Sequence, residues 1–219
     1  MAIISISGKI GSGKDTVAAI IMELANDKQW EVKKWAGKLK EVASLLTGIP
    51  KEKFEDQEFK KTILGPEWNK PVYLKGELVS SEPMTVRDLL QLLGTEAMRN
   101  GLHTDTWVNA LMSEYKTSNG VDTKAEGESS SAVADKFWII TDTRFPNELA
   151  AVIRHEAITI KIVRNSGNHI GVTHSSEQAL DHYENWNYVV DNDGTIDDLR
   201  TKIFNILRNA RIVRTSTLK

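Results

Sequence analysis

The sequence predicts an α/β fold in which a parallel sheet of about five strands is flanked by helices. Short apolar runs alternate along the 219 residues with segments of helical periodicity, which is the pattern of strand–helix–strand units. The composition of 40% hydrophobic and 26% charged residues is that of a globular protein able to bury one large core. Because the chain holds no Cys, we expect neither disulfides nor thiolate zinc sites.

The first elements are a strand, a glycine-rich turn and a helix. Residues 3–6 form a β-branched run that is typical of a strand buried on both faces. Apolar residues then recur at helical spacing over residues 16–27. A second strand is expected at residues 31–35, and a helix at residues 39–46 is expected to end at Gly48-Ile49-Pro50.

The middle of the chain departs from this alternation. Residues 50–82 are polar and interrupted by prolines, and we interpret them as an insertion with one hairpin at residues 73–79. A helix is predicted from Thr85, followed by a second helical stretch over residues 105–115. Residues 117–135 are rich in Ser, Gly, Thr and acidic residues without periodicity, so we expect a mobile loop there.

The second half of the chain returns to alternating strands and helices. An apolar run ends on the acid Asp142, Pro146 starts a helix, and a loop containing Gly and Asn covers residues 164–174. The expected strands cover residues 137–142, 158–163 and 188–190, and the last helix covers residues 196–207. This order predicts a parallel sheet with helices on both faces.

The charge balance argues against one class of function. The 28 Lys and Arg residues are offset by 30 Asp and Glu, a formal net charge of -2, so no overall positive field would hold polymeric nucleic acid. No stretch reaches the roughly 18 apolar residues of a membrane span, and the N-terminus has no secretory signal pattern. We therefore expect a cytoplasmic protein that binds neither polymeric nucleic acid nor a membrane.

A phosphate-binding loop is predicted between the first strand and the first helix. Residues 8–16 (GKIGSGKDT) fit the pattern G-x-x-x-x-G-K, in which backbone N–H groups surround phosphates and the lysine reaches the β- and γ-phosphates. The predicted ATP-binding residues are Gly11, Ser12, Gly13, Lys14, Asp15 and Thr16. Asp15 replaces the usual Ser or Thr, and it either holds Mg²⁺, directly or through water, or complements the positive helix end.

Such a loop indicates that a nucleoside triphosphate binds, but not what is done with it. The chain lacks the Asn-Lys-x-Asp base reader of guanine-nucleotide switches, since its Asn69-Lys70 pair is not followed by the acid. A small-molecule kinase instead needs cations that bring two polyanions together. Arg144 is a candidate because it lies just beyond a strand end, where ligands of open α/β sheets bind. Arg164 also follows a strand and opens a loop, which suits a lid arginine.

Asp142 is the acid at the end of the strand that precedes Arg144. It could hold Mg²⁺ through water, bind a substrate hydroxyl, or pair with Arg144 and shape the loop. Asp15 and Asp142 are therefore the candidate metal ligands.

These motifs resemble the bacteriophage deoxynucleoside monophosphate kinases, within the nucleoside monophosphate kinase group of P-loop proteins. The resemblance rests on residues 8–16, Arg87–Glu96 (RDLLQLLGTE), Trp107, Asp142–Glu148 (DTRFPNE) and residues 174–177 (HSSE). It implies a single P-loop kinase domain over residues 1–219, an acceptor-binding helical insertion at 48–116 and a lid loop at 164–176. The implied activity is transfer of the γ-phosphate of ATP to a deoxynucleoside 5′-monophosphate, with Mg²⁺.

The resemblance also implies roles for individual residues. Arg87 would grip the acceptor phosphate, Gln91 would reach a base or sugar edge, and Trp107 would stack on a base, although a solvated Gln91 and a Trp107 packed in the core stay open. Asp88 departs from family members that carry a second basic residue there. The implied acceptor site comprises Arg87, Gln91, Gly94, Thr95, Trp107, Asp142, Arg144 and Glu148, and the implied catalytic set comprises Lys14, Arg87, Asp142, Arg144 and Arg164.

Two rival functions and the oligomeric state stay open from the sequence. A P-loop kinase of another small metabolite, for instance one resembling dephospho-coenzyme A kinase, would carry the same loop. A regulatory module that binds ATP without transferring phosphate would carry it too. A homodimer is also compatible with the sequence.

Overall fold

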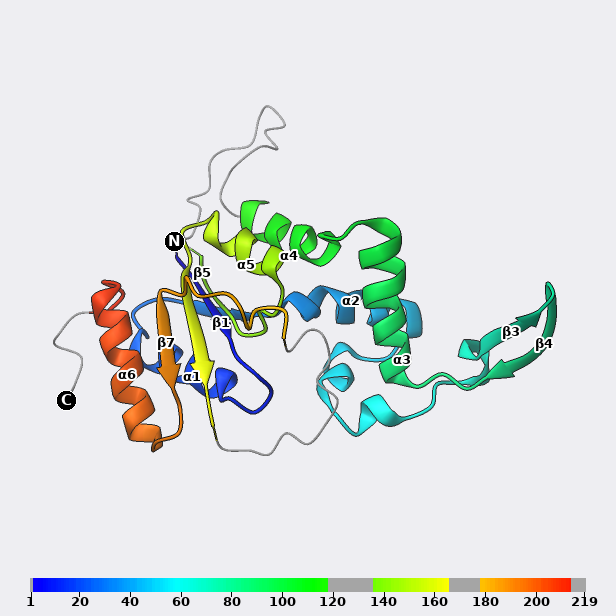
Figure 1. Ribbon diagram of the computed structural model, residues 1–219, viewed down its shortest axis with the longest axis horizontal. Coiled ribbons are helices and arrows are strands. Elements are labelled where there is room, and N and C mark those ends of the chain that lie inside the picture. The colour runs from blue at the N-terminus through cyan, green and yellow to red at the C-terminus, as the bar shows by residue number, and fades with distance from the viewer. Residues whose placement is uncertain (1, 118–135, 166–177, 214–219) are drawn as a thin grey trace, which may run out of the picture. The chain divides into compact units, whose positions relative to one another are not determined.

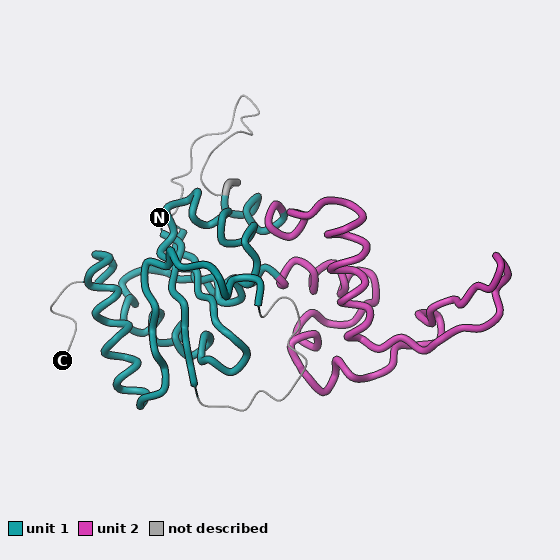
Figure 2. Tube along the Cα trace, in the orientation of Figure 1, with its two compact units in different colours: residues 1–35, 110–219 teal, residues 36–109 magenta. Residues whose placement is uncertain are grey.

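The computed structural model describes residues 2–117, 136–165 and 178–213 (Figure 1). The chain divides into two compact units, one formed by residues 1–35 and 110–219 and the other by residues 36–109 (Figure 2). The second unit overlaps most of the 48–116 segment expected to be an insertion, but its boundaries differ.

The first unit contains a five-stranded sheet, as the sequence predicts. Its order is β2-β5-β1-β6-β7, and all four pairings are parallel. The strands are β1 (Ala2–Ser7), β2 (Trp30–Lys33), β5 (Phe137–Ile140), β6 (Ile158–Val163) and β7 (Tyr188–Asp191). The central strand β1 leads into the predicted phosphate loop.

Helices α1 (Lys14–Leu24) and α6 (Ile196–Asn209) pack together and form a hydrophobic core with the sheet (Figure 1). This core joins the apolar face of α6 to residues of β1 and β6 such as Ile6 and Ile162. Helix α5 (Pro146–Ile153) follows β5, and α4 (Thr106–Thr117) spans the boundary between the units. On α4, Tyr115 packs edge-on against Trp138 of β5, with ring centroids 4.9 Å apart.

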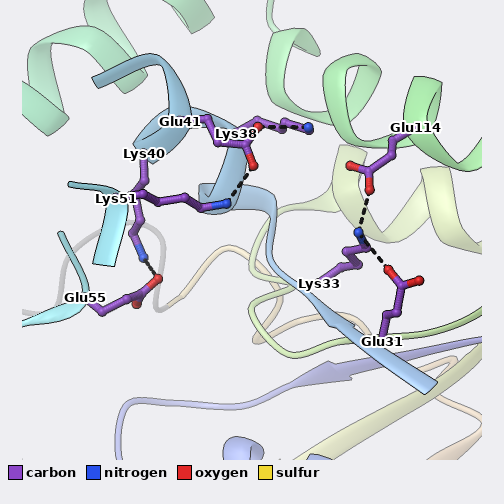
Figure 3. Close-up of polar contacts among 8 residues, drawn as sticks. All are labelled: Glu31, Lys33, Lys38, Lys40, Glu41, Lys51, Glu55 and Glu114. Carbon is purple, nitrogen blue, oxygen red and sulfur yellow. Dashed lines mark hydrogen bonds and ion pairs between the residues drawn. The ribbon is translucent and has the colours of Figure 1, made fainter. Parts of the chain in front are cut away.

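A half-buried ion-pair network also stabilises this unit (Figure 3). The Lys33 ammonium donates a hydrogen bond to Glu114, pairs with Glu31 at 3.0 Å and lies 5.0 Å from the ring centroid of Trp138. Burial alone lowers the pKa of Lys33, but the hydrogen bonds to Glu114 and Glu31 raise it above its ordinary value. The lysine is therefore charged throughout the physiological range.

The second unit is helical with one projecting hairpin. A small core of Ala43, Phe54, Val86 and Leu93 holds it together. Its elements are α2 (Trp35–Thr47), η1 (Lys51–Glu55), η2 (Phe59–Lys61), η3 (Pro66–Trp68), β3 (Lys70–Leu74), β4 (Glu77–Glu82), α3 (Val86–Gln91) and η4 (Leu92–Leu102). The antiparallel β3–β4 pair is the predicted hairpin. Buried Lys40 pairs with Glu55 in this unit (Figure 3).

Some element boundaries differ from the prediction for identifiable reasons. The strand expected at 31–35 ends at Lys33, because the backbone N–H of Trp35 donates to Asp142 Oδ1 at 2.8 Å and the chain turns there into α2. Residues 92–102 form a π-helix that the apolar spacing did not distinguish from an α-helix. None of the helices in the described part of the chain is long and apolar enough to cross a membrane.

Candidate nucleotide-binding site

The candidate site lies at the carboxyl edge of the parallel sheet. Strand β1 pairs with β5 on one side and with β6 on the other. The connection from β1 runs to β2 at one edge of the sheet and that from β6 runs to β7 at the other edge, and such a switch point is where open α/β sheets bind ligands. A pocket of about 310 Å³ lies at this edge. Its lining includes Gly8, Lys9, Ser12, Arg144, Lys161 and Arg164. Four of the twelve lining residues are cationic and one, Asp181, is acidic, so the pocket suits a polyanion.

The loop between β1 and α1 has the backbone that phosphate binding requires. Gly11 and Gly13 adopt left-handed conformations, with φ of +77° and +95°, which side chains disfavour. Gly13 is the N-cap of α1 and supplies no side-chain cap. The first N–H groups of an uncapped helix are suited to binding an anion.

The side chain of Lys14 is held against this loop by backbone carbonyls of the loop. Its ammonium donates to the carbonyls of Gly8, at 2.6 Å, and Lys9, at 2.8 Å. Asp15 and Thr16 follow in the first turn of α1, where both are exposed. The Asp15 side chain is 82% exposed and lies 4.0 Å from the ammonium of Lys34.

Ser12 is the buried centre of the loop. It is 3% exposed, and its carbonyl accepts a 2.8 Å hydrogen bond from the side-chain amide of Asn192. Its hydroxyl is also buried, but has no hydrogen-bond partner within the described ranges. A buried hydroxyl without a partner is costly and calls for an explanation. A bound phosphate would supply the missing partner.

Asp142 connects the end of β5 to the start of α2. Its carboxylate accepts the backbone N–H of Trp35, and the Trp35 indole N–H donates to Thr143 Oγ1 at 3.2 Å. The Thr143 hydroxyl in turn lies 2.8 Å from that of Ser5 on β1. This network fixes the loop that carries Arg144.

The possible metal ligands are separate carboxylates rather than a cluster. Within the described residues, no group of three or more His, Asp or Glu side chains could hold a metal ion. Mg²⁺ in nucleotide sites is commonly bound by one or two carboxylates together with substrate phosphates and water. Asp15 and Asp142 stay predicted metal ligands, since an ion that arrives with its nucleotide needs no cluster of protein carboxylates.

Glu148 holds the backbone of the loop that carries Arg144. It is 4% exposed, and its Oε2 accepts the backbone N–H groups of Arg144, at 2.8 Å, and Phe145, at 3.0 Å. The sequence suggested that Glu148 contacts the acceptor. The structure shows its Oε2 accepting from the backbone that carries Arg144, and the contact with the acceptor stays a prediction.

The remaining predicted acceptor residues lie in the second unit. Arg87, Gln91 and Thr95 are exposed, and Arg87 Nη2 lies 3.5 Å from Gln57 Oε1. Trp107 is 6% exposed, and its indole N–H donates to the carbonyl of Gly94 at 2.9 Å. This contact supports the packing interpretation of Trp107.

Gly94 and Asp88 have structural roles within the same unit. A Cβ on Gly94 would lie 2.9 Å from Leu39 Cδ2, so the close approach there is made by Leu39. Asp88 forms a capping box with Thr85 at the start of α3. The backbone and side-chain hydrogen bonds from Thr85 lower the pKa of Asp88.

Comparison with known proteins identifies the family. The model of the deoxynucleotide monophosphate kinase family matches residues 53–203. The chain belongs to this family. A deoxynucleotide monophosphate kinase of Enterobacteria phage T4 is 30% identical over 126 residues, which are 57% of this chain and 46% of the relative. One of Escherichia phage RB69 is 29% identical over 128 residues, 58% of this chain and 47% of the relative.

This chain spans about half the length of the curated kinases that it matches. The family match includes the motifs at Arg87–Glu96 and Asp142–Glu148, but it starts after the phosphate loop at residues 8–16. For this member of the deoxynucleotide monophosphate kinase family, the donor site therefore rests on the loop geometry described above.

The sequence did not identify Asn192, which holds the phosphate loop in place. Its backbone N–H donates to the carbonyl of Val163, and its side chain donates to Ser12. A signal was present, because Asn192 directly follows β7 and polar residues that follow parallel strands gather at one edge. The predicted lid loop at 164–176 lies outside the described residues from 166 onward.

Proposed function

We propose that this member of the family transfers the γ-phosphate of ATP to a deoxynucleoside 5′-monophosphate. An oxygen of the acceptor phosphate forms a bond to the γ-phosphorus while the bond to the β–γ bridging oxygen breaks, and ADP leaves with that bond's electron pair. The observation that carries the proposal is the position of Arg144 and Arg164 in one pocket with the phosphate-loop residues Gly8 and Ser12. Family membership supports the choice of acceptor.

The donor phosphates bind to the loop and the start of α1. The left-handed glycines allow the backbone to approach the phosphates closely, and the Lys14 ammonium neutralises the β- and γ-phosphates. Ser12 and Thr16 provide hydroxyls. Mg²⁺, when bound through Asp15 or Asp142, offsets the charge of the triphosphate.

Arg144 aligns the acceptor phosphate. Its backbone is held by the buried Glu148, so the guanidinium projects from a fixed base. Arg87, Gln91 and Thr95 are also proposed to bind the acceptor, with Gly94 and Trp107 supporting the helices that carry them. Arg164 stabilises the transferring group. No general base is needed, because a phosphate oxygen is already ionised and positioning supplies most of the rate.

A coupled assay tests this proposal with ATP, Mg²⁺ and each of dAMP, dGMP, dCMP and dTMP. At least one should yield its diphosphate, and chelation of Mg²⁺ should abolish the reaction. Failure with all four, together with turnover of a different small metabolite, would favour the rival metabolite kinase. The same assay run on lysate fractions containing free mononucleotides tests action in a host cytoplasm.

The variant Arg144→Ala separates a kinase from an ATP-binding module. We expect kcat to fall by about 10²–10³-fold, the usual effect of removing one group that stabilises transition-state charge, while ATP affinity changes little. Arg154→Ala is the matched control, because Arg154 is exposed at the end of α5. Equal activity of the two variants would contradict the role of Arg144.

A further inference from the structure

A fourth cation of the pocket, Lys161, has no role in the mechanism given above. It lies near the carboxyl end of β6, directly opposite Ser7 in the parallel register of β1 and β6. Its neighbours Ile160 and Ile162 are buried in the core with α1 and α6. Because side chains alternate along a strand, Lys161 emerges on the opposite face, where it lines the pocket with Arg144 and Arg164.

Lys161 differs from the other pocket lysine, Lys9, in forming no ion pair with any acid in the described part of the chain. Lys9 is exposed and pairs with Asp181 at 3.6 Å. Lys161 is half-buried, and within the described ranges its ammonium has neither a hydrogen bond nor an ion pair. A cation held away from water without a counter-charge is costly. Such a cost is common where a binding site awaits an anion.

The Ser12 hydroxyl lacks a partner in the same pocket. A Cβ on Gly8 would lie 2.6 Å from both this hydroxyl and the carbonyl of Ile162, so the loop and β6 approach each other closely here. One ligand could contact both the Ser12 hydroxyl and the Lys161 ammonium if it is anionic and offers several oxygens. A phosphoryl group fits this description.

We propose that Lys161 is a further catalytic residue, whose ammonium binds the phosphoryl group during its transfer. This inference rests on the proposed function. The pocket is lined both by Gly8 and Ser12, which are proposed to bind the donor, and by Arg144, which is proposed to bind the acceptor phosphate. The transferring phosphoryl group is the part of the reaction that lies between donor and acceptor. Because Lys161 belongs to a strand, its charge is positioned before substrates bind.

Steady-state kinetics of Lys161→Met test this role. We expect kcat to fall by about 10²–10³-fold, with KM for ATP and for the deoxynucleoside monophosphate changing by less than about 5-fold. Lys161→Arg should recover at least about 10-fold of the lost kcat because it restores the charge. Lys136→Met is the control, since Lys136 is a half-buried lysine that precedes β5 at the opposite edge of the sheet, and its kcat should stay within about 2-fold.

Other kinetic outcomes would overturn the proposal. Unchanged kinetics of Lys161→Met would show that the ammonium touches no reacting group. A raised KM for one substrate with unchanged kcat would assign Lys161 to ground-state binding of that substrate. A lower midpoint of thermal unfolding than in the wild type would indicate a structural role, because loss of an unpartnered cation should leave the midpoint unchanged or raise it.

Binding of tripolyphosphate separates this inference from the proposed function. Calorimetry with tripolyphosphate and Mg²⁺ needs no acceptor, and we expect about 3–5-fold weaker binding to Lys161→Met than to the wild type. If the wild-type protein phosphorylates no deoxynucleotide but this difference is seen, the proposed function fails and the contact of Lys161 with phosphate stands. Equal affinities would refute that contact.

Discussion

The contact between Gly13 and Asn192 leads to a quantitative prediction about the phosphate loop. Gly13 has φ of +95°, and a Cβ there would lie 2.4 Å from the side-chain nitrogen of Asn192. That nitrogen donates to the buried carbonyl of Ser12. Gly13→Ala should therefore strain the backbone and also displace the amide that holds the loop.

The two costs can be estimated separately. A left-handed alanine costs about 1–2 kcal/mol, and a buried carbonyl left without its donor costs about 1–3 kcal/mol. Gly13→Ala should incur both costs, and Asn192→Ala only the second. In the double variant the Cβ added at position 13 meets no Asn192 side chain, and the Ser12 carbonyl loses its donor only once. The double variant should therefore be about 1–3 kcal/mol more stable than the sum of the single effects predicts.

Urea unfolding of the wild type, both single variants and the double variant measures this coupling. Gly11→Ala is the matched control, because Gly11 also has a left-handed φ of +77° but a Cβ there meets no described atom within 4 Å. Its effect should add to that of Asn192→Ala within about 0.5 kcal/mol. Additive effects of Gly13→Ala and Asn192→Ala would refute the reasoning, as would coupling of equal size at Gly11.

Two further predictions concern stability. Thr85→Ala should cost about 1 kcal/mol through loss of the helix cap. The lowered pKa of Asp88 gives stability that is present above its unfolded-state pKa and is lost as pH falls through its folded-state pKa. Because the Thr85 side chain contributes to this lowering, urea unfolding of Thr85→Ala should show a smaller loss of stability on acidification than the wild type shows. Lys33→Met should cost about 1–2 kcal/mol by urea unfolding at pH 7, because two carboxylates lose a half-buried partner. Lys61→Met, which removes an exposed pair, should cost at most about 0.5 kcal/mol, and equal losses would contradict the importance of burial.

The fold could be predicted in outline because the sheet leaves a strong local signal. Four strands of the first unit, β1, β5, β6 and β7, contain short apolar runs and overlap the predicted ranges closely. Strand β2 (WEVK) carries a weaker signal because two of its four residues are charged. The strand order could not be predicted in this way, since it depends on which runs pair. The π-helical turns of residues 92–102 were also not predictable, because a shift from i→i+4 to i→i+5 bonding barely changes the apolar spacing.

The candidate site was predictable where chemistry is contained in one short segment. The phosphate loop is such a segment, and its glycines adopt the left-handed backbone that the pattern implies. Glu148 shows what the sequence alone does not reveal. Its sequence neighbourhood places it beside Arg144, but only the fold shows that its buried carboxylate accepts hydrogen bonds from two backbone N–H groups.

Asn192 shows how the prediction could be extended. It lies 180 residues from Ser12, so no motif joins them. The parallel sheet brings them together because β7 pairs with β6 and β6 pairs with β1, which places the residues after all three strands at one edge. The rule that identified Arg144 after β5 applies equally to Asn192 after β7. Once the strand order is known, each polar residue just beyond a strand is a candidate either to bind the nucleotide or to hold the loop that does.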